Sequence, residues 1–137
     1  MESSVDSDQR RIREVLAAYC HRCDDGDFTT LADLFAPEGA FVYRGEVASG
    51  RSAVERWFEA AQGRPSQRGR HLTVNTVVDL QGDRAKVLSD FLFLRCVDGT
   101  VTPAVVGRYQ DDFARVGGQW LIERREVQPF SPSPSHG

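Results

Sequence analysis

The sequence predicts an α+β domain in which three helices cover the concave face of a curved, mainly antiparallel sheet. Three observations support this prediction. Apolar residues recur at three- and four-residue steps in the first half of the chain. From Arg70 onward the period changes to two, which is typical of strands with one buried face. Short glycine-containing turns separate these strand-like runs, as in a meander of consecutive antiparallel strands.

The composition suits one domain with a real core. The 137 residues are 40% apolar and 27% charged. We expect the domain to occupy residues 1–128, and residues 129–137 to be a disordered tail because they are rich in serine and proline. The net charge of −3 is spread along the chain without a basic cluster, so no nucleic-acid partner is expected. No apolar stretch approaches the length of a membrane span and no leader peptide is recognisable, so we expect a cytoplasmic protein with no membrane partner.

The three cysteines are expected to be free thiols, because their number is odd and no leader peptide precedes them. Cys20 and Cys23 have the C-x-x-C spacing, but they lie near the end of a helix rather than at its start, where the dipole would lower a thiol pKa. A zinc site would need two more ligands, and the remaining candidates, Cys96 and His136, lie in a strand and in the tail. We therefore expect neither a metal nor a cofactor.

The first helix is predicted to begin near Ser7 or Asp8. Its apolar stripe turns Tyr19 toward the core; the stripe comprises Ile12, Leu16, Tyr19 and Cys23. Asp24 falls at the end of this helix, where the dipole disfavours a carboxylate, so it should be solvated or held by a partner. Gly26 suits the left-handed position that ends a helix, and Asp27 is placed to cap a second helix that runs through Phe35.

The remaining elements follow from turn signals and periodicity. Residues 37–39 predict a turn and residues 40–43 a short strand. A third helix, capped by Ser49 or Ser52 and ended at Gly63, has Val54, Trp57, Phe58 and Ala61 on its buried face. Four strands are then predicted over residues 70–80, 84–96, 100–115 and 119–127.

The last hairpin predicts which polar groups face the core. A two-residue turn at Gly117-Gly118 places Asp111 opposite Arg124, with both side chains directed inward and Arg125 on the other face. The apolar residues of that inner face are Tyr109, Phe113, Trp120 and Ile122. On the strand over 70–80, the same alternation puts His71, Thr73 and Asn75 on one face. Asp90 lies in a strongly apolar run, so it must face solvent or have a partner.

These features resemble the SnoaL-like family of the nuclear transport factor 2-like superfamily over residues 8–128. The matching features are Ile12, Tyr19, Asp24-x-x-Asp27-Phe28 and Leu34 to Pro37; Gly50-Arg51; Arg70-His71 and Asn75; Gly82-Asp83-x-Ala85; Gly107-Arg108-Tyr109-x-Asp111; and Gly118-x-Trp120-x-Ile122-x-x-Arg125. The resemblance implies a cone-shaped α+β barrel and a homodimer. It does not by itself choose an activity, because this fold carries dehydratases, isomerases, polyketide cyclases, hydrolases and non-catalytic subunits.

The resemblance also nominates a site. Tyr19, Asp24 and His71 match the pattern of cofactor-independent dehydratases, including the bile-acid 7α-dehydratases and scytalone dehydratase, although the second pocket histidine of the latter has no equivalent here. Asp90 and Arg124 are weaker catalytic candidates. The expected substrate pocket comprises Phe41, Trp57, Phe58, Asn75, Tyr109 and Asp111.

The expected chemistry is acid/base catalysis next to a carbonyl of an apolar or aromatic small molecule. His71 suits the base, Tyr19 can donate a hydrogen bond to the oxygen that gains charge, and Asp24 can orient the imidazole or protonate a leaving hydroxyl. Two alternatives stay open. One is a non-catalytic ligand-binding or accessory subunit, like the small subunit of ring-hydroxylating dioxygenases. The other is an epoxide-hydrolase-like enzyme that uses Asp90, Arg124 and Asp111.

Overall fold

The computed structural model describes residues 3–130, which form three α-helices and one six-stranded sheet. The helices are α1 (Ser4–Asp24), α2 (Phe28–Ala32) and α3 (Arg51–Gln62), and a short 3-10 helix, η1, covers Pro65–Gln67. The strands are β1 (Phe35–Tyr43), β2 (Glu46–Ser49), β3 (Arg70–Gln81), β4 (Arg84–Val97), β5 (Thr100–Val116) and β6 (Gln119–Pro129).

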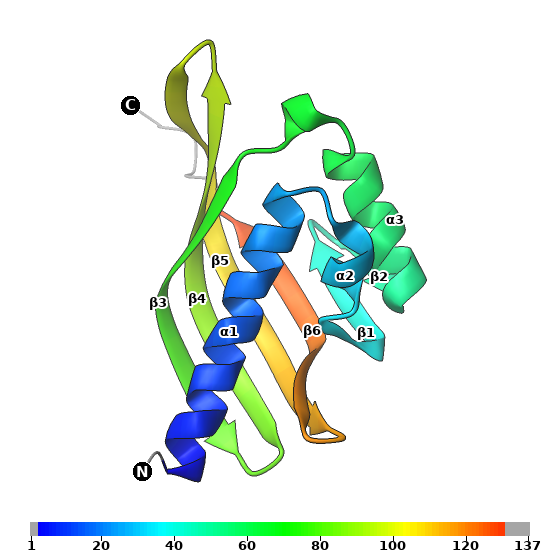
Figure 1. Ribbon diagram of the computed structural model, residues 1–137, viewed down its shortest axis with the longest axis vertical. Helices are drawn as coiled ribbons and strands as arrows, with labels where there is room; N and C mark the ends of the chain where they lie inside the picture. Colours follow the sequence, from blue (N-terminus) through cyan, green and yellow to red (C-terminus); the bar gives the residue numbers. More distant parts are fainter. Residues whose placement is uncertain (1–2, 131–137) are drawn as a thin grey trace, which may run out of the picture.

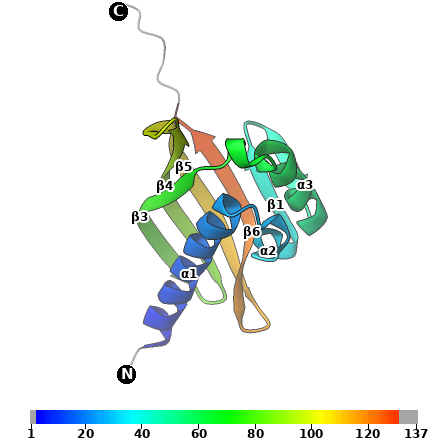
Figure 2. The same cartoon turned by 45° about the horizontal axis from the view of Figure 1, so that its top comes forward.

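The sheet is a curved meander with one parallel addition. Its order is β2-β1-β6-β5-β4-β3, and every neighbouring pair is antiparallel except β1 and β6. Helix α1 runs diagonally across the concave face, while α2 and α3 lie over the end formed by β1 and β2 (Figures 1 and 2). The predicted fold class is therefore confirmed.

The helix boundaries differ from the prediction at the starts of α1 and α3 and at the end of α2, which stops at Ala32 rather than at Phe35. α1 begins at Ser4 because the Ser3 hydroxyl caps it by accepting from the backbone N–H of Asp6. Asp27 occupies the N-cap position of α2, but its side chain makes no capping bond, and α2 is only five residues long. Gly50, rather than a serine, precedes α3, and its φ of +87° suits glycine.

The first two strands were predicted incompletely. β1 begins at Phe35 and includes the predicted turn at 37–39, which forms an irregularity between the pairings of Phe35 and Ala40 with β6. β2 was not predicted; it pairs with β1 across the tight turn at Arg44 and Gly45, both of which have positive φ. Pairing with neighbouring strands stabilises these segments, and such pairing leaves little trace in local sequence.

A bulge in β3 reverses which side chains face inward. Val74 pairs with Asp90 and Val77 with Leu88, so Asn75 and Thr76 together oppose one residue of β4. Asn75 has a φ of +54°, and its amide donates to the half-buried Asp90 on the convex face. The prediction that Asn75 shares the inner face with His71 is therefore wrong.

A second bulge corrects the predicted pairing of Asp111. The hairpin begins as predicted, with Val116 opposite Gln119 and Trp120 buried, but the register shifts after Ile122. Asp111 then lies opposite Arg125, which is fully buried, while Arg124 is exposed on the convex face. The predicted Asp111–Arg124 pair and the outward position of Arg125 are both wrong, because one extra residue in β6 inverts the alternation.

The end of the sheet extends slightly into the predicted tail. β6 continues through Pro129, and the Phe130 N–H donates to the Val106 carbonyl at 2.7 Å. The rest of that tail prediction, residues 131–137, lies outside the described residues. Among the described helices, none is long and apolar enough to cross a membrane.

Candidate active site

A mostly aromatic cavity of about 380 Å³ lies between the concave face of the sheet and the helices. Its aromatic lining consists of Tyr19, Phe41, Tyr43, Trp57, Phe58, Phe91, Phe93 and Tyr109. Its polar lining consists of Gln62, Gln67, His71 and Arg95. Four of the predicted pocket residues, Phe41, Trp57, Phe58 and Tyr109, therefore line it. Asn75 and Asp111 do not, because Asn75 lies on the convex face and Asp111 is buried beside Arg125.

A carboxylate–imidazole pair joins the end of α1 to the start of β3. One Asp24 carboxylate oxygen lies 2.6 Å from Nδ1 of His71, and the other accepts from the His71 backbone N–H at 3.0 Å. The side chains of His71 and Asp24 are only 8% and 6% exposed. Asp24 therefore has the partner that its position at the negative end of the helix dipole requires.

The two bonds fix the orientation of the imidazole. A carboxylate that accepts at Nδ1 keeps the proton on that nitrogen and leaves Nε2 as the basic atom. The ring also packs against Phe93, with centroids 4.5 Å apart. His71 is thus held on one side by hydrogen bonds and on the other by an aromatic wall.

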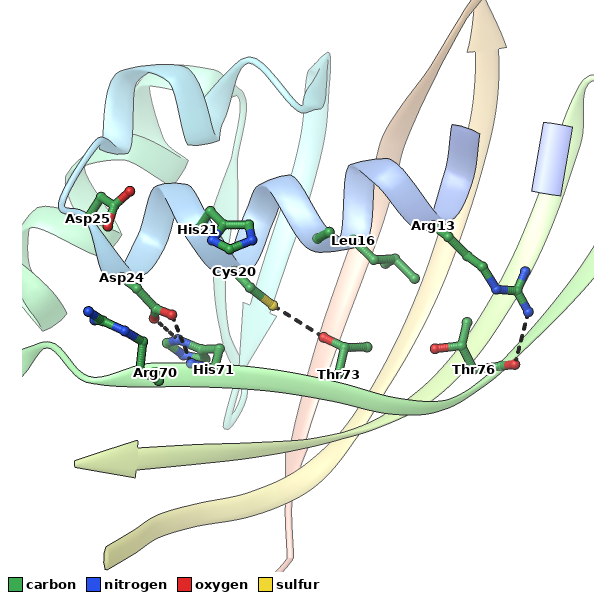
Figure 3. Close-up of a pocket in the computed structure, with 11 residues that line it drawn as sticks. Arg13, Leu16, Cys20, His21, Asp24, Asp25, Arg70, His71, Thr73 and Thr76 are labelled. Atoms are coloured by element: carbon green, nitrogen blue, oxygen red, sulfur yellow. Dashed lines mark hydrogen bonds and ion pairs between the residues drawn. The ribbon is translucent and has the colours of Figure 1, made fainter. Parts of the chain in front are cut away.

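His71 belongs to the wall between the inner cavity and an outer groove. The groove has a volume of about 560 Å³ and lies between α1 and β3. Figure 3 shows Asp24 and His71 beside His21 and Arg70 at one end of this groove, with Arg13 near the other. The pair is therefore accessible from two sides: His71 faces both spaces, whereas Asp24 lines only the groove.

Tyr19 packs on a buried cation. The guanidinium of Arg125 lies 4.2 Å from the centre of the Tyr19 ring and 3.6 Å from that of Tyr109. Arg125 makes two hydrogen bonds to Asp111, at 2.8 and 2.9 Å, and both side chains are fully buried. Burial opposes the charge on Arg125, but the Asp111 carboxylate more than compensates and holds the pKa of Arg125 above its usual value.

The Tyr19 hydroxyl is suited to donate rather than to ionise. Burial, followed by the neighbouring Tyr109, raises the pKa of Tyr19 well above its usual value, and Arg125 offsets this only in part. The ring lies on the predicted buried stripe of α1 and lines the cavity. Tyr19 therefore offers a neutral O–H group to a bound molecule.

Asp90 and Arg124 lie outside the cavity. Asp90 accepts from Asn75 and from Arg108 on the convex face, and these two bonds lower its pKa. Arg124 donates to Glu126 at 3.3 Å. Asp90, Arg124 and Asp111 are therefore not brought together, so the geometry does not assemble the set that an epoxide-hydrolase-like site would need.

Cys23, Asp24 and His71 are the described residues that could hold a metal ion, since their ligand atoms lie within 4.8 Å of one another. The Cys23 thiol is buried, and burial followed by the neighbouring Asp24 raises its pKa, which disfavours the thiolate that binds metals. It donates instead to the Gln62 side-chain oxygen at 3.6 Å. The donor set thus fits a hydrogen-bonded group better than a metal centre, and all three cysteines are free, as predicted.

Several functional candidates were missed from the sequence. Phe91 and Phe93 alternate in an apolar run, which could have placed both on the inner face of β4. For Arg125, a signal was present: the apolar residues Ile122 and Val127 are an odd number of positions apart, so both can face inward only if a bulge lies between them. Arg95 gave no comparable signal, because only the tertiary structure brings the end of β4 to the cavity.

A curved sheet with an aromatic cavity under three helices is the architecture of the nuclear transport factor 2-like class. Within that class, the chain belongs to the SnoaL-like domain family, which matches residues 6–126. No curated protein matches the chain in sequence.

Similar solved structures support the same class. Rv3472 from Mycobacterium tuberculosis, a protein of unknown function, is 28% identical, with a TM-score of 0.88 over 96% of this chain and 78% of that one. An NTF2-like protein with a cystatin-like fold from Novosphingobium aromaticivorans is 28% identical, with a TM-score of 0.85 over 93% of this chain and 84% of that one. A provisionally named scytalone dehydratase from the same organism is 24% identical, with a TM-score of 0.80 over 96% and 89%, and at this identity it supports the fold alone.

Proposed function

We propose that the protein is a cofactor-independent enzyme that moves a proton next to a carbonyl group, as a dehydratase, double-bond isomerase or cyclase does. The observation that carries this proposal is the Asp24–His71 pair, in which Nδ1 lies 2.6 Å from the carboxylate and the other ring nitrogen has no hydrogen-bond partner within residues 3–130. An imidazole whose second nitrogen carries a lone pair can accept a proton as a general base does. The aromatic cavity beside it suits an apolar or aromatic substrate.

In the proposed reaction, Nε2 of His71 removes a proton from the carbon next to the carbonyl. The C–H electron pair moves into the new C=C bond, and the carbonyl oxygen gains negative charge that the Tyr19 hydroxyl stabilises by donating a hydrogen bond. Asp24 stabilises the imidazolium that forms. The imidazolium then returns its proton either to a hydroxyl on the next carbon, which leaves as water, or to a more distant carbon, which gives an isomer.

The first half of this reaction can be tested without knowing the natural substrate. Exchange of the α-hydrogens of 2-tetralone for deuterium in D₂O, followed by NMR, reports proton removal alone. We expect the protein to accelerate exchange, and His71→Asn to lose about two to four orders of magnitude of that acceleration. Asp24→Asn should lose a comparable part, because an amide cannot stabilise the imidazolium.

His21→Asn is the matched control, since His21 is exposed on the same helix and lines only the outer groove. It should exchange at the parent rate. Exchange by His71→Asn at the parent rate would refute the acid/base proposal. Binding of 2-tetralone without any catalysed exchange would instead favour the non-catalytic ligand-binding subunit.

We also propose that two copies of the chain associate through the convex face of β3, β4 and β5. That face exposes an unusual number of apolar side chains for a surface sheet, namely Leu72, Val74, Val77, Leu88 and Val106. Charges of both signs lie among them, including the Asp90–Arg108 and Lys86–Asp112 pairs. A surface with both signs can complement its own symmetric copy.

A further inference from the structure

Three polar side chains of the cavity, Gln62, Gln67 and Arg95, come from neighbouring segments and carry N–H donors. Gln62 ends α3, Gln67 ends η1, and Arg95 is tied to this region because its guanidinium donates to the Ser66 carbonyl at 2.6 Å. All three side chains line the cavity. No aspartate or glutamate is among the residues that line it.

The two glutamines are already occupied as acceptors. The Gln67 side-chain oxygen accepts from the Arg64 backbone N–H at 3.0 Å, and the Gln62 side-chain oxygen accepts from the Cys23 thiol. Their remaining polar groups are the NH₂ groups, which are donors. The protein thus presents this end of the cavity as a set of N–H groups.

Arg95 keeps its positive charge uncompensated. Within residues 3–130, no carboxylate forms an ion pair with it, and its one hydrogen bond to a protein atom leaves other guanidinium N–H groups free. Arg125, which lies against Tyr19 and Tyr109 of the cavity wall, is neutralised by two bonds to Asp111. The cavity therefore combines an aromatic lining with a single unpaired cation.

From this arrangement we infer that the cavity recognises planar aromatic carboxylates, with the carboxylate bound by Arg95 and the two glutamine NH₂ groups. A guanidinium matches the two oxygens of a carboxylate in one plane, and partial burial strengthens such a charge-assisted bond. The ring system of the ligand would pack among Phe41, Trp57 and Phe58. This inference names the substrate class of the proposed active site and so rests on that cavity being the substrate site.

Binding of two probes of nearly equal shape tests the inference. Naphthalene-2-carboxylate and naphthalene-2-methanol differ in charge, and Trp57 in the cavity wall provides a fluorescence signal, which calorimetry can check. We expect the carboxylate to bind about ten- to a hundredfold more tightly than the alcohol, because charge-assisted hydrogen bonds are stronger than neutral ones by about that factor in affinity. Arg95→Gln should abolish this preference by weakening binding of the carboxylate far more than binding of the alcohol, and Arg95→Lys should keep part of it.

Arg108→Gln is the control, because it removes a partly exposed cation from the convex face. It should leave the preference intact. Equal affinity of the parent protein for both probes, failure of both probes to bind, or an undiminished preference in a folded Arg95→Gln variant would overturn the inference. His71→Asn should keep the preference whatever it does to proton exchange, so the outcome is independent of whether the protein is catalytic.

Discussion

At the scale of single residues, Asp24 and His71 resolve a conflict that the sequence alone presents. The end of a helix is unfavourable for a carboxylate, and a histidine at the start of a strand has no local reason to be ordered. The two residues are 47 positions apart, yet the Asp24 carboxylate forms hydrogen bonds with the His71 ring and with its backbone N–H, and these bonds join α1 to β3. The pair is a candidate for function because its histidine also lines the aromatic cavity.

Tyr19→Phe separates the role of the hydroxyl from that of the ring. The phenyl ring would still pack on Arg125, so the free energy of unfolding should change by less than about 1 kcal/mol. Loss of the hydrogen bond to the developing oxyanion should slow deuterium exchange about a hundredfold. Thermal unfolding and the exchange rate provide the two measurements, and an unchanged rate would remove Tyr19 from the mechanism.

The pH dependence of the parent protein checks the same residue. Because burial raises the pKa of Tyr19, its hydroxyl should remain protonated throughout the range in which an ordinary tyrosine begins to ionise. Tyr19 should therefore not deprotonate, and the exchange rate should not fall for that reason, up to about pH 10. The Tyr19→Phe variant is the reference here: an alkaline fall in the parent protein that disappears in this variant would contradict the prediction.

Asp111→Asn and Arg125→Met should differ in how their stability responds to pH. Asp111→Asn leaves a buried guanidinium that cannot lose its proton, so it should cost about 3–5 kcal/mol at any moderate pH. Arg125→Met leaves a buried carboxyl whose pKa burial raises. A carboxyl whose pKa is higher in the folded state than in the unfolded state binds its proton more tightly in the folded state, so protonation stabilises the fold. This variant should therefore regain stability as the pH falls from 8 to 5.

Urea unfolding at pH 5 and pH 8 measures both variants. The convex-face variant Arg124→Met provides the control and should lose less than about 1 kcal/mol, because its bond to Glu126 is exposed. Equal pH dependence of the two buried variants would show that the Asp111 carboxyl does not titrate in the folded protein.

At the scale of elements, two bulges decide which polar residues reach the interior. The bulge in β3 moves Asn75 to the convex face. The bulge in β6 turns Arg125 into the core and Arg124 to the convex face. Each bulge adds a single residue to one strand, and one residue is enough to invert every later side chain. The four long strands were predicted well, whereas the faces of two of them were predicted correctly only as far as the bulge.

The position of α1 over β3 creates two spaces beside His71, and a pair of bulky substitutions can show which of them the substrate uses. Ala61 lines the aromatic cavity and Ala17 lines the outer groove. Ala61→Trp should reduce catalysed exchange of 2-tetralone at least tenfold by filling the cavity, while Ala17→Trp should leave it nearly unchanged. The opposite result would place the reaction in the outer groove.

At the scale of the whole molecule, the exposed apolar side chains of the convex face predict a dimer. In solution the 15.3 kDa chain should show twice its mass by light scattering at micromolar concentration. Val77→Lys, at the proposed interface, should give the monomeric mass, because it would bury a cation against apolar side chains. Val47→Lys, on the exposed strand at the opposite end of the sheet, should remain dimeric. A monomeric parent protein would contradict the proposal.

The sequence by itself determined the class of fold, the meander of four long strands and the inward position of Tyr19. These features depend on local periodicity and turn chemistry, which neighbouring residues carry. The resemblance to a family added Asp24 and His71 as catalytic candidates. In the structure, Nδ1 of His71 lies 2.6 Å from a carboxylate oxygen of Asp24.

Only the tertiary structure decided which cation is buried, which polar groups meet at the cavity and where β1 and β2 pair. Arg125 reaches the core because a bulge relieves the strict alternation of β6, and Arg95 reaches the cavity because the end of β4 lies beside η1. Both outcomes depend on contacts between residues far apart in the chain. Such contacts form because buried charges must find partners and strands must match their neighbours, and neither requirement can be read from a local pattern.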